Sequence, residues 1–150
     1  MKRMACFAVL VALSTSLWAA SPWSGVWVMR ESTPGFRLTM ILEEVGAGWK
    51  ITMRIPNAQG TATASVMTID TALDGKDAPT LVDGKQSGQT MQIRKIDDRH
   101  TITIMKLNGQ QSGISKSELS ADGKTITTEN DYSVSGPNGS NKQIQHWDKQ

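Results

Sequence analysis

The sequence predicts an all-β protein, an up-and-down antiparallel barrel of nine or ten strands. Short segments of alternating apolar and polar residues follow one another along the chain, a pattern typical of strands with one buried side. Turn signals such as Asn108-Gly109 and Asp122-Gly123 separate these segments, and such pairs favour type I′ hairpins because both residues accept positive φ. No window carries a sustained 3.6-residue apolar period, so we expect no long helix.

The first twenty residues have the layout of a secretory signal peptide. Lys2 and Arg3 are followed by the apolar run Ala5–Leu13, and Ala19 and Ala20 offer small residues for cleavage. An uncleaved membrane anchor is the alternative, but the apolar run is shorter than the ~20 residues that a span requires. We therefore expect a signal peptide over 1–20, a single domain over 21–150, and a secreted, periplasmic protein without a membrane span.

Removal of the signal changes the composition in two ways. The single cysteine, Cys6, leaves with it, so the domain contains no thiol and no disulfide. Loss of Lys2 and Arg3 leaves 14 basic residues against 14 acidic ones, and the basic residues are scattered singly. A neutral domain without a basic run argues against binding to nucleic acid or to an anionic membrane surface. We expect a monomer.

Ten segments have strand character. In the first half of the chain they are Ser24–Glu31, Arg37–Glu44, Trp49–Ile55, Thr61–Ala72 and Asp77–Val82. In the second half they are Gln89–Ile96, Arg99–Leu107, Gln110–Leu119, Lys124–Val134 and Ser140–Lys149. Asp74-Gly75, Asp83-Gly84, Asp97-Asp98 and Asn138-Gly139 are the expected turns between several of them. Because the connections are short, a barrel is favoured over a sandwich, which usually needs longer crossovers.

Both ends of the predicted domain carry motifs of known barrels. Gly25-Val26-Trp27 resembles the Gly-x-Trp signature of the calycins, and the ending Gln145–Gln150 is similar to that of the cellular fatty-acid-binding proteins. Ile96–Arg99 and Ser120–Thr125 resemble segments of secreted bacterial lipocalin-like proteins. The resemblance implies a lipocalin-like barrel that holds one small apolar ligand, with Trp27 packed across its closed end. Asn130-Asp131-Tyr132 looks like a second lipocalin motif but comes too late in the chain, so we interpret it as coincidence.

The last strand departs from the fatty-acid-binding pattern. Where that family has an arginine and a tyrosine that hold the ligand carboxylate, this chain has Gln145 and Trp147. An amide and an indole N–H donate hydrogen bonds but do not neutralise a buried carboxylate. The departure favours a neutral or weakly polar ligand.

Six residues are the candidates for contact with such a ligand. Met40 and Met53 lie mid-strand on apolar faces, where adaptable thioether side chains suit a flexible ligand; core packing is the alternative. Trp49 and Trp147 are placed either at a pocket mouth or in the core. Gln145 points either into the barrel or outward, depending on which alternate residues of its strand face the interior. Arg94 points either into the barrel or into solvent. The candidates are Met40, Trp49, Met53, Arg94, Gln145 and Trp147.

Signals for catalysis and metal binding are missing. The chain has no Gly-x-Ser-x-Gly elbow, phosphate loop or His-Glu-x-x-His, and its two histidines, His100 and His146, lie in different segments. We therefore expect no enzyme, no cofactor and no metal, but a binding protein for a small apolar or amphipathic molecule inside the barrel. The alternative is a filled barrel that binds proteins, for example a cell-wall hydrolase, through the Pro56–Gly60 and Gly136–Asn141 loops.

Overall fold

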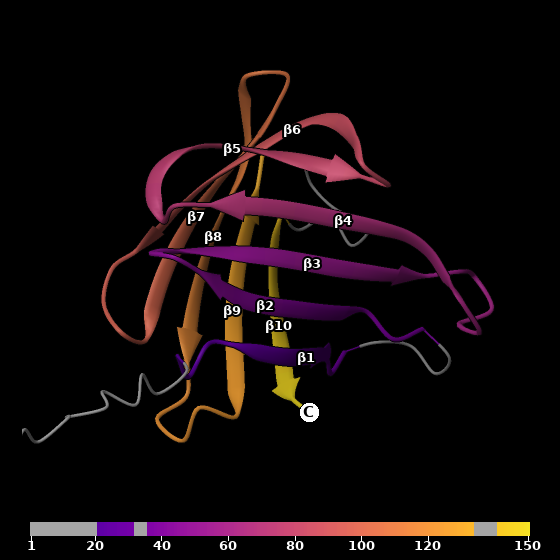
Figure 1. Ribbon diagram of the computed structural model, residues 1–150, viewed down its shortest axis with the longest axis horizontal. Coiled ribbons are helices and arrows are strands. Elements are labelled where there is room, and N and C mark those ends of the chain that lie inside the picture. Colours follow the sequence, from indigo (N-terminus) through magenta and orange to yellow (C-terminus); the bar gives the residue numbers. More distant parts are fainter. Residues whose placement is uncertain (1–20, 32–35, 134–140) are drawn as a thin grey trace, which may run out of the picture.

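The computed structural model describes residues 21–31, 36–133 and 141–150, which form one closed barrel of ten antiparallel strands (Figure 1). The strands are β1 (Gly25–Met29), β2 (Thr39–Val45), β3 (Gly48–Pro56), β4 (Thr63–Thr71), β5 (Asp74–Val82), β6 (Lys85–Lys95), β7 (His100–Leu107), β8 (Gln110–Leu119), β9 (Thr125–Tyr132) and β10 (Lys142–Lys149). Each strand pairs with its neighbours in sequence, and β1 pairs with β10. The prediction of an all-β, up-and-down antiparallel barrel is confirmed, with ten strands.

Closure depends on the short pairing of the first and last strands. Trp27, Val28 and Met29 of β1 lie opposite Lys149, Asp148 and Trp147 of β10. The Gln150 amide also donates to the Val26 carbonyl at 2.9 Å. Pairing the two terminal strands leaves no unpaired sheet edge, which is the usual hazard of an open antiparallel sheet.

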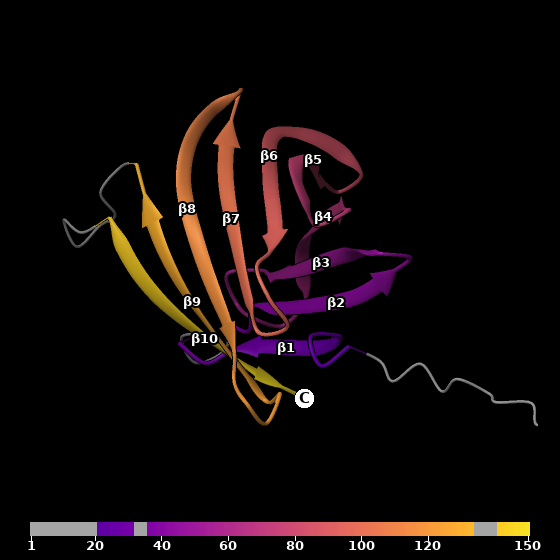
Figure 2. The ribbon, with the colours of Figure 1, turned by 90° about the vertical axis from the view of Figure 1, so that its left-hand side faces the viewer.

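The two ends of the barrel are packed differently. Odd-numbered strands run from the end where β1 begins and β10 finishes toward the opposite end, and even-numbered strands return (Figures 1 and 2). Most buried apolar residues lie at the end from which the odd strands start, hereafter the closed end; they are Trp23, Trp27, Leu42, Trp49, Ile51, Ile69, Ala78, Ile93, Leu119, Ile126 and Trp147. At the opposite, open end, the inward methionines Met40, Met53 and Met91 are only partly buried. The core therefore fills one half of the barrel.

Two predicted hairpins have the expected backbone. Asp83 and Gly84 have φ of 49° and 78°, and Asn108 and Gly109 have φ of 49° and 81°. Positive φ at both central residues matches the twist of paired strands, and aspartate, asparagine and glycine tolerate it best. Asp83 also accepts a hydrogen bond from the Val66 amide at 2.8 Å, which ties this turn to β4.

The predicted turn at Asp74-Gly75 was wrong. These residues belong to β5, where the register with β6 shifts between Asp74 and Asp77, as in a β-bulge. Gly75 supplies the positive φ, 77°, that the irregularity requires. The chain reverses one step earlier, at Leu73 with φ of 60°, where the Leu73 amide donates to the Thr71 hydroxyl at 3.1 Å. Asn138-Gly139 lies outside the described residues.

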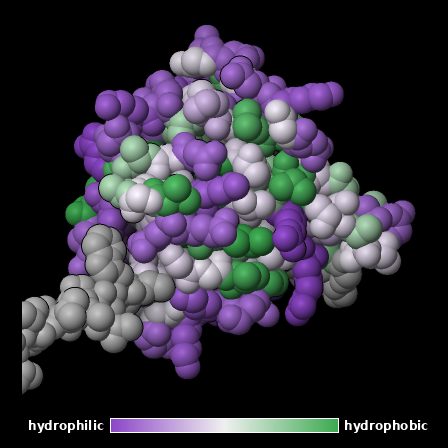
Figure 3. Space-filling model, in the orientation of Figure 1, coloured by the Kyte–Doolittle hydropathy of each residue, from purple (hydrophilic) through white to green (hydrophobic). Residues whose placement is uncertain are grey.

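The outer surface mixes polar and apolar side chains. Figure 3 shows hydrophobic residues interspersed with hydrophilic ones on the face formed largely by the early strands. The exposed large apolar residues come from separate parts of the barrel: Val26, Val45, Ile96, Leu107 and Ile144. Single exposed residues of this kind are normal for a soluble domain. In the described part of the chain, no helix has the length and apolar character needed to cross a membrane.

Candidate functional site

A cavity of about 280 Å³ lies inside the barrel. Its position follows from the alternation of the strands, because every second residue of each strand points inward. At the closed end its walls merge with the buried core, and toward the open end they consist of partly buried side chains. The lining residues are Trp23, Leu38, Met40, Leu42, Trp49, Ile51, Met53, Met67, Ile69, Met91, Ile93, Thr101, Thr103, Met105, Ser115, Ser117, Ile126, Thr128, Asn130, Tyr132, Gln145 and Trp147.

Tryptophans form the floor of this cavity. The ring centroids of Trp23 and Trp49 lie 5.2 Å apart at an interplanar angle of 42°. Trp27 below them is completely buried, as the resemblance implied for the closed end. Trp49 and Trp147 are 5% and 4% exposed, so they belong to the floor and not to the mouth that was their alternative placement.

Five methionines line one part of the cavity wall. Met40 of β2, Met53 of β3 and Met67 of β4 are successive register partners, and Met91 of β6 is the register partner of Met105 of β7. Directly opposed residues on one face have Cβ atoms about 5 Å apart, so their side chains pack against one another. Methionine has three rotatable bonds and a polarisable sulfur, and such a wall adapts to the shape of what it contacts.

Hydroxyl and amide groups line the other part of the wall. Ser117 of β8 and Thr128 of β9 share a hydrogen bond of 2.9 Å between their hydroxyl oxygens. One step nearer the open end, the Ser115 hydroxyl donates to the Asn130 side-chain oxygen. Gln145 of β10 is the register partner of Thr128 and continues this polar surface around the barrel.

Among the described residues that line the cavity, none has a charged side chain. The one lining residue that titrates is Tyr132, and burial raises the pKa of its phenol, which therefore stays neutral in ordinary buffers. A buried ligand charge would meet no opposite charge and would lose its hydration. The electrostatics of the cavity therefore favour an uncharged occupant.

Arg94 does not belong to this site. It follows the buried, inward-facing Ile93 on β6 and is exposed on the outer face of the barrel. Its guanidinium lies over the bulge at Gly75, about 3.0 Å from where a side chain at that position would begin. The candidacy of Arg94 for ligand contact was wrong, and its alternative placement in solvent holds, because Ile93 takes the inward position and alternation sends Arg94 outward.

A wider space adjoins the cavity at the open end. It measures about 500 Å³ and shares Met91, Met105 and Tyr132 with the cavity wall. Its other borders come from β6, β7 and β8 and include Gln89, Lys106, Leu107 and Gln110. We call this space the vestibule, because it shares three residues with the cavity wall.

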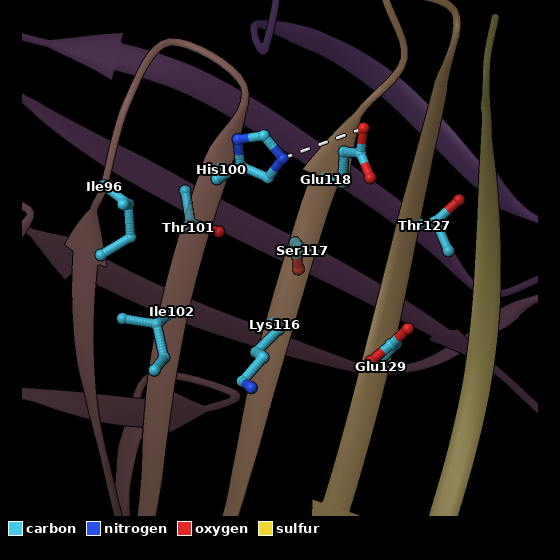
Figure 4. Close-up of a pocket in the computed structure, with 9 residues that line it drawn as sticks. All are labelled: Ile96, His100, Thr101, Ile102, Lys116, Ser117, Glu118, Thr127 and Glu129. Atoms are coloured by element: carbon cyan, nitrogen blue, oxygen red, sulfur yellow. Dashed lines mark ion pairs between the residues drawn. The ribbon is translucent and has the colours of Figure 1, made fainter.

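A second depression lies on the outer face of β7, β8 and β9 (Figure 4). It measures about 340 Å³, and Figure 4 shows His100, Lys116, Glu118 and Glu129 among the side chains around it. The His100 Nε2 atom lies 3.8 Å from Glu118, and its Nδ1 atom lies 2.8 Å from Asp97. His100 contacts the carboxylates of Glu118 and Asp97, and exposed pairs of this kind contribute little binding energy. The internal cavity is the better candidate site.

Metal ligands do not cluster in the described segments. Within residues 21–31, 36–133 and 141–150, no three side chains of histidine, cysteine, aspartate or glutamate are placed to hold one ion.

Of the six residues expected from the sequence, five line the cavity: Met40, Trp49, Met53, Gln145 and Trp147. The prediction omitted Met67, Met91, Met105, Ser115 and Asn130. Period-two alternation carried the missing signal, since Thr128 and Asn130 follow Ile126 on one face of β9. The sequence drew attention to Asn130 only through a motif interpreted as coincidence, whereas its position on β9 directs it inward. No family model, curated protein or solved structure matches this chain.

Proposed function

We propose that this protein binds a small apolar or amphipathic molecule inside its barrel, as a secreted, periplasmic, calycin-like protein without catalytic activity. The cavity of about 280 Å³, open toward a vestibule and closed by tryptophans, is the observation that carries the proposal. Ligand sites are typically concave, mostly apolar and of about 300 Å³ or more, with a few polar groups. This cavity lies just below the lower end of that range.

The wall supports a flexible ligand. Five adaptable methionines face the interior, and a well-packed core of this size has no structural need for an open cavity beside them. Side chains that line an empty cavity lack van der Waals contacts on that side, and a bound molecule would supply those contacts. Occupancy would therefore stabilise the fold by mass action.

The alternative function, protein binding through loops, is less well supported. It requires a filled barrel, and the interior cavity argues against that requirement. Most of the Gly136–Asn141 loop lies outside the described residues. At the Pro56–Gly60 loop, the Asn57 side chain accepts from the Thr61 amide at 3.0 Å, a contact that stabilises the loop itself.

Titration with an uncharged apolar dye, N-phenyl-1-naphthylamine, tests the proposal. The purified protein should take up the dye saturably, with a blue-shifted emission. Met53→Trp places a larger ring in the cavity and should weaken binding tenfold or more, whereas Thr52→Trp on the outer face of the same strand should not. A folded protein that shows no saturable uptake would refute the proposal.

A further inference from the structure

The side-chain amide of Asn130 is hydrogen-bonded at its oxygen but not at its nitrogen. Asn130 is 6% exposed, and its side-chain oxygen accepts a hydrogen bond from the Ser115 hydroxyl. The side-chain nitrogen, Nδ2, has no hydrogen-bond partner within the described residues. Buried polar groups are almost always paired, and an exception calls for an explanation. Because Asn130 lines the cavity, a group of the ligand could accept the hydrogen bond of Nδ2.

The cavity has two facing walls of different polarity, and Asn130 lies on the more polar one. In a closed ring of ten strands, β7, β8 and β9 lie across the barrel from β2, β3 and β4 (Figure 2). The second group contributes Met40, Met53 and Met67, and the first contributes Asn130 and several hydroxyls together with Met105 and Ile126. A ligand with one polar group and an apolar body can place the polar group at Asn130 and its body against Met40, Met53 and Met67.

The chemistry of the free amide specifies the polar group. An NH₂ group donates hydrogen bonds and does not accept them. Since the lining residues carry no cation, a carboxylate would be left without a counter-charge, whereas a carbonyl or ether oxygen needs only the donor. Ser115 holds the amide at its oxygen end, and Nδ2 is the donor that has no partner within the described residues.

We propose that the ligand is a neutral molecule with a carbonyl or ether oxygen that accepts a hydrogen bond from Asn130 Nδ2, while its flexible apolar part packs against the methionine wall. This inference rests on the proposed function, because it identifies the ligand class of the same cavity. It assigns Asn130 as the specificity-determining residue of the site.

Three probes of eight carbons test the ligand class on the unmodified protein by displacement of the bound dye. We expect 2-octanone to bind about tenfold or more tightly than n-octane, because an unsatisfied buried donor is costly, and more tightly than octanoate. Equal affinity for 2-octanone and n-octane, or a preference for octanoate, would overturn the inference. Either of those results leaves cavity binding intact, whereas failure of the dye itself to bind would remove the proposed function.

Two variants test the assignment to Asn130. Asn130→Leu removes the donor and should bring the affinities for 2-octanone and n-octane to within about twofold. Thr127→Val, on the outer face of the same strand, should keep the preference. Thermal unfolding establishes that each variant is folded. A preference that survives in folded Asn130→Leu would exclude Asn130, and should this variant not fold, the probe series on the unmodified protein still decides the ligand class.

Discussion

The indole N–H of Trp27 donates to the backbone carbonyl of Trp23 at 2.9 Å, beneath the cavity floor. The Trp23 indole in turn donates to the carbonyl of Asp98, at 2.7 Å, in the β6–β7 loop. The two rings are 0% and 2% exposed. These two hydrogen bonds connect β1, the segment before it and the β6–β7 loop. The closed end is therefore stabilised by both packing and hydrogen bonds.

Truncation of Trp27 should therefore be among the most damaging changes in the chain. Trp27→Ala should lower the free energy of unfolding by about 3–5 kcal/mol, because it leaves a cavity and an unpaired carbonyl. Urea unfolding followed by circular dichroism measures the effect. Val45→Ala, at a side chain that is 60% exposed, should change stability by less than about 0.5 kcal/mol. Similar losses for both variants would contradict this account of the closed end.

The β2–β3 turn offers a test of close backbone approach. A Cβ at Gly48 would lie 2.1 Å from the Thr71 carbonyl oxygen, whereas one at Gly46 would meet nothing within 4 Å. Gly48→Ala should cost about 1–3 kcal/mol or more, since backbone must move. Gly46→Asn should cost only a few tenths of a kcal/mol, because asparagine tolerates the φ of 61°. Chemical denaturation compares them, and a tolerated Gly48→Ala would show that β3 and β4 separate more easily here than the packing indicates.

The β5–β6 turn tests the role of a side chain in fixing a hairpin. Asp83 combines positive φ with hydrogen bonds from the Val66 amide at 2.8 Å and the Ser65 hydroxyl at 3.2 Å. Asp83→Asn keeps the shape and one acceptor, whereas Asp83→Ala loses the bonds and strains the backbone. We expect Asp83→Ala to be less stable than Asp83→Asn by about 1 kcal/mol, measured by thermal unfolding. Equal stability would mean that Gly84 alone specifies the turn.

Stability should fall in acid through carboxylates paired with cations on the outer surface. Arg30 donates two hydrogen bonds to Asp148, and this interaction lowers the pKa of Asp148 below its ordinary value of 3.8. A carboxylate with a lowered folded-state pKa stabilises the fold above its unfolded pKa, and the contribution disappears as pH falls through the folded pKa. Melting temperature measured below about pH 4 should therefore decline less steeply in Asp148→Asn.

Glu31 should also contribute to the loss of stability in acid, because its pKa is lowered as well. Partial burial acts to raise its pKa, but hydrogen bonds from the backbone amide and ring of His146 outweigh it, and the net pKa lies below 4.5.

Arg30→Gln should flatten the acid limb as Asp148→Asn does. The double variant should add little, since each single variant already removes the same interaction between Arg30 and Asp148. An acid limb in Asp148→Asn that superimposes on that of the unmodified protein would exclude the pair as a source of pH dependence.

Oxidation of the methionine wall should impair binding. Conversion to sulfoxide makes a flexible apolar side chain polar, and Met40, Met53 and Met91 are only partly buried. Mild peroxide treatment should weaken uptake of the apolar dye severalfold, and methionine sulfoxide reductase should restore it. Mass spectrometry locates the modified residues. Unchanged affinity after oxidation of these methionines would separate them from the binding surface.

Much of the fold is encoded locally and can be predicted from the sequence. Strand segments, tight hairpins such as Asn108-Gly109 and the inward alternation of Met40 and Met53 depend on neighbouring residues, because pleating and turn geometry act over two to four positions. The Asp74-Gly75 pair misled the prediction, since positive φ at glycine serves a bulge as readily as a turn.

The sequence by itself thus determined an antiparallel barrel with an apolar lining. Only the tertiary structure decided which end is closed, that Trp49 and Trp147 form a floor, and that Asn130 faces a methionine wall. Those relations join residues far apart in the chain, as in the contact between Trp23 and Asp98 across 75 positions. Their geometry depends on the register of all ten strands at once, because a slip of one residue in any pair exchanges inside for outside.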